Sequence, residues 1–197
     1  MTAPFKLGLT GSIGMGKSTT AALFAAQGIP VWDADAAVHR LYARGGAAVA
    51  AVATLYPEAL AGTAINRSAL NAVIARDPSA LARIEAIVHP LVAADRAAFI
   101  AAAQADLILL DIPLLFETGS ESQLDATLLV TAPAALQRAR VLARPGMTEA
   151  RFNRLLARQM PDAEKRARAT HIVETLDLAA TTAYVSALIA HIRDRHA

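Results

Sequence analysis

The chain has 197 residues, of which 55% are hydrophobic and 5% aromatic, and its formal net charge is +2. This length suits one α/β domain with a decorating subdomain and a mostly aliphatic core. The absence of cysteine excludes disulfide bonds and thiolate metal sites. Its longest uncharged stretches, at 45–57 and 178–190, are shorter than the ~20 residues of a membrane span. The first apolar stretch leads directly into a glycine-rich loop rather than a signal peptide, so we expect a cytoplasmic protein.

The N-terminal part of the chain predicts two strand–helix units. The first is a strand at 6–9 with a helix at 17–27, and the second is a strand at 29–33 with a helix to about Leu41. Gly28, with Pro30 just beyond it, is typical of a helix C-terminus. Residues 45–104 read as helical almost throughout and predict no strand.

Proline positions divide this helical stretch. Asp77–Pro78 is expected to start one helix. His89–Pro90 is expected to mark a helix boundary or a kink, because proline disfavours the α conformation in the residue before it.

Further strands are predicted at 107–110, 126–131 and 171–173, the first of them ending in Asp111. Helices between and after them are expected to start at Pro133, Thr148 and Asp162, with Pro145–Gly146 ending the first and a terminal helix reaching about Arg195. Strands that alternate with helices predict a parallel sheet covered by helices on both faces.

A phosphate-binding loop is the strongest motif in the sequence. The pattern G-x-x-x-x-G-K-[ST] is matched without a gap, after a strand and at the start of a helix. Its glycines let backbone N–H groups turn toward an anion, and the helix N-terminus adds positive field. Lys17 should reach the β- and γ-phosphates of ATP, Ser18 should coordinate Mg²⁺, and Thr19 can contact the α-phosphate. The loop residues are Gly11, Ser12, Ile13, Gly14, Met15, Gly16, Lys17 and Ser18.

Two interpretations stay open, one for the loop and one for Asp111. The loop could be an ordinary glycine-rich turn followed by a surface lysine. Asp111 could be a carboxylate of the Walker B type that holds magnesium, or a solvated residue at a strand end. The guanine-specifying motif Asn-Lys-x-Asp is missing, which argues against a GTPase.

Basic residues concentrate in segment 138–168, which holds nine of the chain's 19 lysines and arginines against three acidic residues, a charge of +6 (9 − 3). The segment could bind RNA or cradle the phosphates of a small ligand. Arg140 and Arg144 are four residues apart and should share a helix face, where guanidinium groups suit phosphate oxygens. A solvated basic helix end is the alternative. Arg154 fits a phosphate contact and a lone surface arginine equally well.

Several motifs together resemble one family. In order they are Gly11–Thr19, Asp33-Ala34-Asp35, His89-Pro90, Ile112 through Glu117, and Gln159-Met160-Pro161 with Lys165. Over nearly its whole length the chain is similar to the dephospho-coenzyme A kinases. The resemblance implies a P-loop core with a five-stranded parallel sheet (1–44, 105–139 and 169–197), a helical coenzyme A-binding insert (45–104) and a lid (140–168). It also implies that ATP, with Mg²⁺, phosphorylates the ribose 3′-hydroxyl of dephospho-coenzyme A.

The resemblance also implies roles for single residues. Asp35 would orient the acceptor hydroxyl and take its proton, and Lys17, Arg140 and Arg144 would act on the phosphates. The implied acceptor contacts are Asp35, His89, Leu114, Leu115, Phe116 and Glu117. The alternatives are a helix N-cap for Asp33 or Asp35, plain core for residues 114–116, and a structural role for His89. The family pattern after the lid, Ala-Asp and then a strand ending in Asp-Asn, departs here to Ala169-Thr170 and Glu174-Thr175.

Two other functions remain as alternatives. One is a different P-loop kinase acting on a small molecule or a nucleoside monophosphate. The other is a non-catalytic regulator that binds a nucleotide or RNA through the basic segment. The expected partner is a small-molecule substrate, with no nucleic acid and no membrane, and the histidine spacing predicts no transition-metal site.

Overall fold

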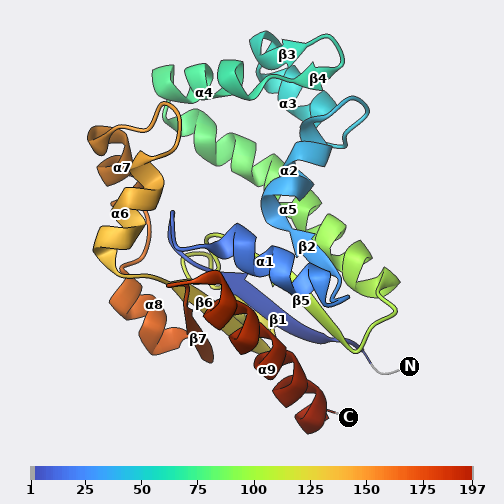
Figure 1. The fold of residues 1–197 in the computed structure, drawn as a ribbon. Helices are drawn as coiled ribbons and strands as arrows, with labels where there is room; N and C mark the ends of the chain where they lie inside the picture. Colours follow the sequence, from blue (N-terminus) through green and yellow to red (C-terminus); the bar gives the residue numbers. More distant parts are fainter. Residues whose placement is uncertain (1–2, 197) are drawn as a thin grey trace. The chain divides into compact units, whose positions relative to one another are not determined.

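The computed structural model describes residues 3–196, which form two compact units (Figure 1). The core unit comprises the described residues up to Trp32 and from Ala103 onward, and the helical unit is Asp33–Ala102. Within the described residues, no helix is both long and apolar enough to cross a membrane.

A five-stranded parallel sheet forms the centre of the core unit, as the alternation of strands and helices predicts. In spatial order the strands are β2 (Val31–Asp33), β5 (Leu107–Asp111), β1 (Phe5–Thr10), β6 (Ala126–Thr131) and β7 (His171–Glu174). Leu9 of β1 lies opposite Asp111 of β5, and Thr131 of β6 lies opposite Glu174 of β7. Because parallel strands end at the same edge, the segments that follow β1, β5, β6 and β7 meet there.

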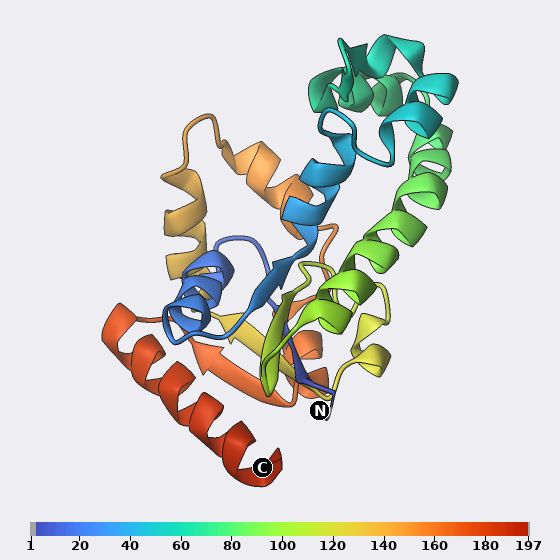
Figure 2. The same ribbon diagram turned by 90° about the vertical axis from the view of Figure 1, so that its right-hand side faces the viewer.

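The helices of the core unit are α1 (Lys17–Ala26), α6 (Ala134–Leu142), α7 (Glu149–Leu156), α8 (Asp162–Arg168) and α9 (Leu178–His196). A short 3₁₀ helix, η2, spans Ser120–Gln123. Figure 2 shows α9 beside α1, and Phe24 of α1 and Val185 of α9 are buried in the same apolar cluster as Leu7 and Leu128 of the sheet. Burial of apolar side chains such as these is the dominant favourable contribution to the free energy of folding.

The helical unit contains α2 (Ala34–Tyr42), α3 (Val49–Leu55), the 3₁₀ helix η1 (Pro57–Ala59), α4 (Arg67–Arg76) and α5 (Ser79–Ala102). Its own core includes Val52, Leu70 and Val88. The expectation of no strand in this region is wrong, since β3 (Leu60–Ala61) and β4 (Ala64–Ile65) pair as an antiparallel hairpin. Two-residue strands are too short to produce a recognisable alternation of polar and apolar residues.

Element boundaries follow the sequence signals with some differences. β6 has the expected bounds, and Thr148 caps α7 by accepting a hydrogen bond from the Arg151 N–H. Pro133 is the N-cap of α6 rather than its first residue, and Asp162 is the first residue of α8 rather than its cap. Helix α5 continues through Pro90, so His89–Pro90 is not a helix boundary.

Candidate active site

The phosphate loop connects β1 to α1 and has the backbone conformation that its glycines allow. Gly14 and Gly16 have φ angles of 79° and 91°, in the left-handed region that residues with a Cβ atom rarely adopt. A Cβ on Gly16 would also lie 2.8 Å from the Thr175 hydroxyl. Gly16 is the N-cap residue of α1, so the loop ends where the positive end of the helix dipole begins.

One residue of the loop, Ile13, is held at both its N–H and its carbonyl by glutamine side chains. Gln137 donates from Nε2 to the Ile13 carbonyl at 2.8 Å, and the Ile13 N–H donates to Gln159 Oε1 at 3.0 Å. Gln137 comes from α6 and is buried, with 4% of its surface exposed. The loop is therefore fixed by bonds to α6 and to the segment before α8. Sequence reasoning missed Gln137, although it lies one helical turn before Arg140.

Lys17 and Asp111 form an ion pair at the edge of the sheet. Asp111 is only 2% exposed and ends β5 beside the strand that carries the loop. Burying a carboxylate is costly unless it is paired, so this contact accounts for a charge in an apolar strand. It also holds the Lys17 ammonium at the end of the loop.

The residues present also suit a magnesium ion. Mg²⁺ is usually held by one or two protein oxygen ligands together with phosphate oxygens and water. Ser18, at the start of α1, offers a hydroxyl, and Asp111 offers a carboxylate. Among the described residues, no three His, Cys, Asp or Glu side chains gather as a self-contained metal site. An ion held by Ser18 and Asp111 would take its remaining ligands from phosphate oxygens and water.

A pocket of about 310 Å³ opens beside the loop within the core unit. Arg140 donates from Nη1 to the Thr175 hydroxyl at 2.9 Å and from Nη2 to the Thr175 carbonyl at 2.6 Å. The lining residues are Gly14, Gly16, Thr19, Thr20, Arg140, Arg144, Thr175, Leu176, Asp177, Leu178 and Thr181. Two guanidinium groups and the phosphate loop thus share one concave surface, which suits a phosphorylated ligand.

Arg140 and Arg144 meet at this pocket, but they do not lie on one helix as expected. Helix α6 ends at Leu142, with Ala143 as its C-cap, so Arg144 follows the helix. The next residue, Pro145, disfavours helical backbone at Arg144 and accounts for the early end.

Three other arginines of segment 138–168 are paired with carboxylates. Arg138 pairs with Glu149, Arg168 with Glu121, and Arg166 with both Asp162 and Glu174. Arg154 lies exposed on α7. Arg140 and Arg144 line the pocket beside the phosphate loop, which makes them the members of the segment best placed for a phosphate ligand.

The expected acceptor wall, residues 114–117, follows β5 in the core unit. Leu115 and Phe116 are buried at 0% and 2% exposure, whereas Leu114 is 44% exposed. Glu117 lies 2.9 Å from the ammonium of Lys165, which is fully buried, and its carboxylate also accepts the Met160 N–H. Burial raises the pKa of Glu117, but the hydrogen bonds from Lys165 and Met160 outweigh it and the pKa lies below its ordinary value. A role for these residues toward the acceptor stays a prediction.

Replacing Lys165 by methionine should lower the free energy of unfolding by roughly 3 kcal/mol, because it leaves the Glu117 carboxylate without its counter-charge. Urea unfolding at neutral pH measures this change. The matched control is Lys6→Met, which removes an ion pair with Asp125 whose side chains are 30% and 40% exposed and should change stability by less than about 1 kcal/mol. Equal losses in the two variants would contradict a structural role for the Lys165–Glu117 pair.

In the helical unit, the structure separates the two aspartates at the start of α2. Asp33 is the N-cap, and its carboxylate accepts the Ala36 N–H at 2.9 Å. Asp35 lies in the first turn with an exposed side chain, so it is not the cap. His89 is exposed on α5.

Four features together define a P-loop kinase: the order of the strands, the phosphate loop between β1 and α1, the lysine at the start of α1, and the pocket lined by two arginines. The family model described as dephospho-CoA kinase matches residues 5–179. The chain therefore belongs to the dephospho-CoA kinase family. It is 72% identical over 191 residues to the dephospho-CoA kinase of Cereibacter sphaeroides, with 97% of each chain covered.

Solved structures agree in fold. The crystal structure of TT1252 from Thermus thermophilus superposes with a TM-score of 0.86 at 39% identity, covering 96% of this chain and 98% of that one. A dephospho-CoA kinase from Campylobacter jejuni superposes with a TM-score of 0.68 at 18% identity, covering 97% and 98%. The second likeness concerns the fold alone.

Proposed function

We propose that this protein transfers the γ-phosphoryl group of ATP to the ribose 3′-hydroxyl of dephospho-coenzyme A, which gives ADP and coenzyme A, the last step of coenzyme A synthesis. The observation that carries the proposal is an intact phosphate loop sharing a pocket with Arg140 and Arg144, in a chain that belongs to the dephospho-CoA kinase family.

On the nucleotide side, backbone N–H groups of the loop and the start of α1 bind the phosphates. Lys17 contacts the β- and γ-phosphates, while Arg140 and Arg144 stabilise charge that develops on the transferred group. Ser18 and Asp111 would hold Mg²⁺, which when bound neutralises phosphate charge. Lys17 would then contact both the Asp111 carboxylate and the phosphates.

On the acceptor side, Asp35 is the proposed base. The 3′-hydroxyl oxygen forms a bond to the γ-phosphorus while the bond from that phosphorus to the β–γ bridging oxygen breaks, and ADP leaves. The hydroxyl proton passes to the Asp35 carboxylate and then to water. The capping role of Asp33 supports this choice, because it leaves the exposed Asp35 carboxylate available. His89 and the segment 114–117 are proposed acceptor contacts, and 45–104 the coenzyme A-binding insert.

A panel of acceptors tests the proposed substrate. ADP release should be fast with dephospho-coenzyme A and slow with nucleoside monophosphates or small hydroxyl compounds, because binding energy from the remote pantetheine part contributes to orienting the hydroxyl. Rapid turnover of a nucleoside monophosphate instead would favour a different P-loop kinase. Filter binding to RNA, with its salt dependence, tests the regulator alternative.

The proposed lid, 140–168, should become protected when substrates bind. Its closure would exclude water from the nucleotide and limit hydrolysis of ATP. We expect amide hydrogen exchange across this segment to slow when ATP and dephospho-coenzyme A, or a bisubstrate analogue, are both bound. Exchange in α9, outside the segment, serves as the internal control. Unchanged exchange over 140–168 would refute a mobile lid.

A further inference from the structure

Carbonyl groups of the phosphate loop are occupied by bonds that define its shape. The Ser12 carbonyl accepts the Met15 N–H at 3.1 Å, and the Ile13 carbonyl accepts Gln137. The Met15 carbonyl accepts the Thr175 hydroxyl at 2.8 Å. These bonds within the protein support the shape of the loop.

Thr175 bonds to this loop and to Arg140 at the same time. A hydroxyl has one proton to donate and two lone pairs to accept with. The Met15 carbonyl is at 2.8 Å and the Thr131 carbonyl at 3.4 Å, so the proton goes mainly to Met15. The same oxygen accepts Arg140 Nη1 at 2.9 Å. Thr175 is only 6% exposed, which makes each of these bonds costly to lose.

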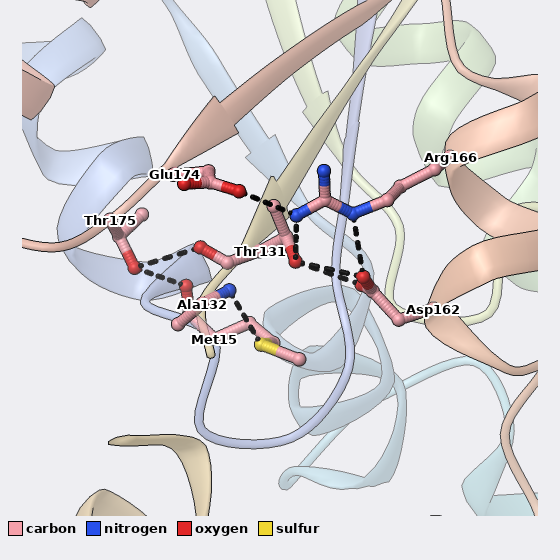
Figure 3. A network of polar contacts seen from close by, with 7 residues as sticks. All are labelled: Met15, Thr131, Ala132, Asp162, Arg166, Glu174 and Thr175. Carbon is pink, nitrogen blue, oxygen red and sulfur yellow. Dashed lines mark hydrogen bonds and ion pairs between the residues drawn. The ribbon is translucent and has the colours of Figure 1, made fainter. Parts of the chain in front are cut away.

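Thr175 is itself held in place by the ends of two strands. Its N–H donates to the Thr131 carbonyl at 2.9 Å, which continues the pairing of β6 with β7. Figure 3 shows the surrounding network, in which Arg166 joins Asp162 to Glu174 and Thr131. The Ala132 N–H donates to the sulfur of Met15 at 3.0 Å, so the loop also bonds to the residue that follows β6.

We propose that the Thr175 hydroxyl is a positioning group that couples the phosphate loop to Arg140. It fixes the Met15 peptide on one side and the Arg140 guanidinium on the other, so that the loop and the cation approach the nucleotide phosphates in a set geometry. The inference rests on the proposed function, since Arg140 acts on the phosphates there. It also gives a physical role to a residue at which this chain departs from the family pattern.

The experiment compares Thr175→Val with Thr175→Ser. Valine keeps the size and β-branching but removes the hydroxyl, whereas serine keeps the hydroxyl. We expect Thr175→Val to lower kcat/KM for ATP roughly 10- to 100-fold, the usual consequence of leaving buried polar groups without a partner. Thr175→Ser should stay within several-fold of wild type, and KM for dephospho-coenzyme A should change little in either variant.

Thr170→Val is the matched control. The Thr170 hydroxyl bonds to Thr127 at the start of β6 and β7, at the opposite edge of the sheet from the loop. This variant should lower Tm without changing kcat/KM.

A second comparison uses the double variant. Thr175→Val should lower kcat/KM for ATP by a much smaller factor in an Arg140→Ala background than in the wild type, because the two residues act through one contact.

Wild-type kcat/KM in Thr175→Val, equal losses in the valine and serine variants, or additive losses with Arg140→Ala would each overturn the proposal. Should Thr175→Val not fold, Thr175→Ala makes the same comparison with a smaller side chain.

Calorimetric binding of a non-hydrolysable ATP analogue separates the coupling role of Thr175 from the proposed substrate, because it measures nucleotide binding without the acceptor. If the wild type binds the analogue but does not phosphorylate dephospho-coenzyme A, the proposed substrate is wrong. Weaker analogue binding by the valine variant would still support the coupling.

Discussion

Replacing Lys17 by alanine is expected to leave a folded protein with almost no kinase activity. The ammonium lies at the start of α1, where it can neutralise charge on the β- and γ-phosphates as the bond between them breaks. Removing one preorganised electrostatic contact of this kind commonly lowers turnover ~10²- to 10³-fold. The rate of ADP release at saturating ATP and dephospho-coenzyme A measures the effect.

Folding of the Lys17→Ala variant must be checked, because Lys17 is also the partner of buried Asp111. Circular dichroism and thermal unfolding should show a folded variant of lower stability. Lys6→Ala is the matched control, since Lys6 lies near the opposite end of β1 and pairs with exposed Asp125. Turnover of Lys17→Ala within a few-fold of wild type would be incompatible with the phosphate-loop assignment.

The second large effect is expected from Asp35→Asn, which should lower turnover by ~10²–10⁴, the usual contribution of a positioned acid or base. Asparagine keeps the shape of the side chain but removes its charge and its capacity to take a proton. Tm should barely change, because Asp35 is exposed and is not the helix cap. The KM for ATP should stay close to wild type, because the proposed role concerns the acceptor.

Asp33→Asn is the matched control for this substitution. Asp33 caps α2, and asparagine is also a good N-cap, so both stability and turnover should change much less. A magnesium titration separates the remaining possibility: if Asp33 helps to hold magnesium, its defect should ease as magnesium is raised and the Asp35 defect should not. If Asp33→Asn proves the more damaging variant and is insensitive to magnesium, the wrong carboxylate has been chosen as the base.

Local signals in the sequence predicted the fold well. The strand at Ala126–Thr131 and the Thr148 cap follow from neighbouring residues alone, and so does the glycine-rich loop. Predictions that depend on tertiary contacts, such as a helix boundary at His89–Pro90, are less reliable. Helix α5 runs through Pro90 because Ile84 and Val88 are buried on its apolar face and support the helix on the N-terminal side of the proline.

The bonds that shape the candidate site could not be read from the sequence. Thr175 is 160 residues from Met15, and Gln159 is 146 residues from Ile13. Such pairs form only when the fold brings the ends of the strands together. The sequence alone does not show how the strands align. The sequence singles out Gln159 as part of a motif and Thr175 as a departure from the family pattern, but it does not predict their contacts with the loop.

The most direct test of the account is the reaction itself. The wild-type protein is incubated with ATP, magnesium and dephospho-coenzyme A, ADP release is followed, and the product is separated and compared with authentic coenzyme A. We predict stoichiometric ADP and a product that carries a new phosphate on the ribose 3′-oxygen. ADP release that does not depend on dephospho-coenzyme A, or a phosphate placed on another hydroxyl, would contradict the proposed function.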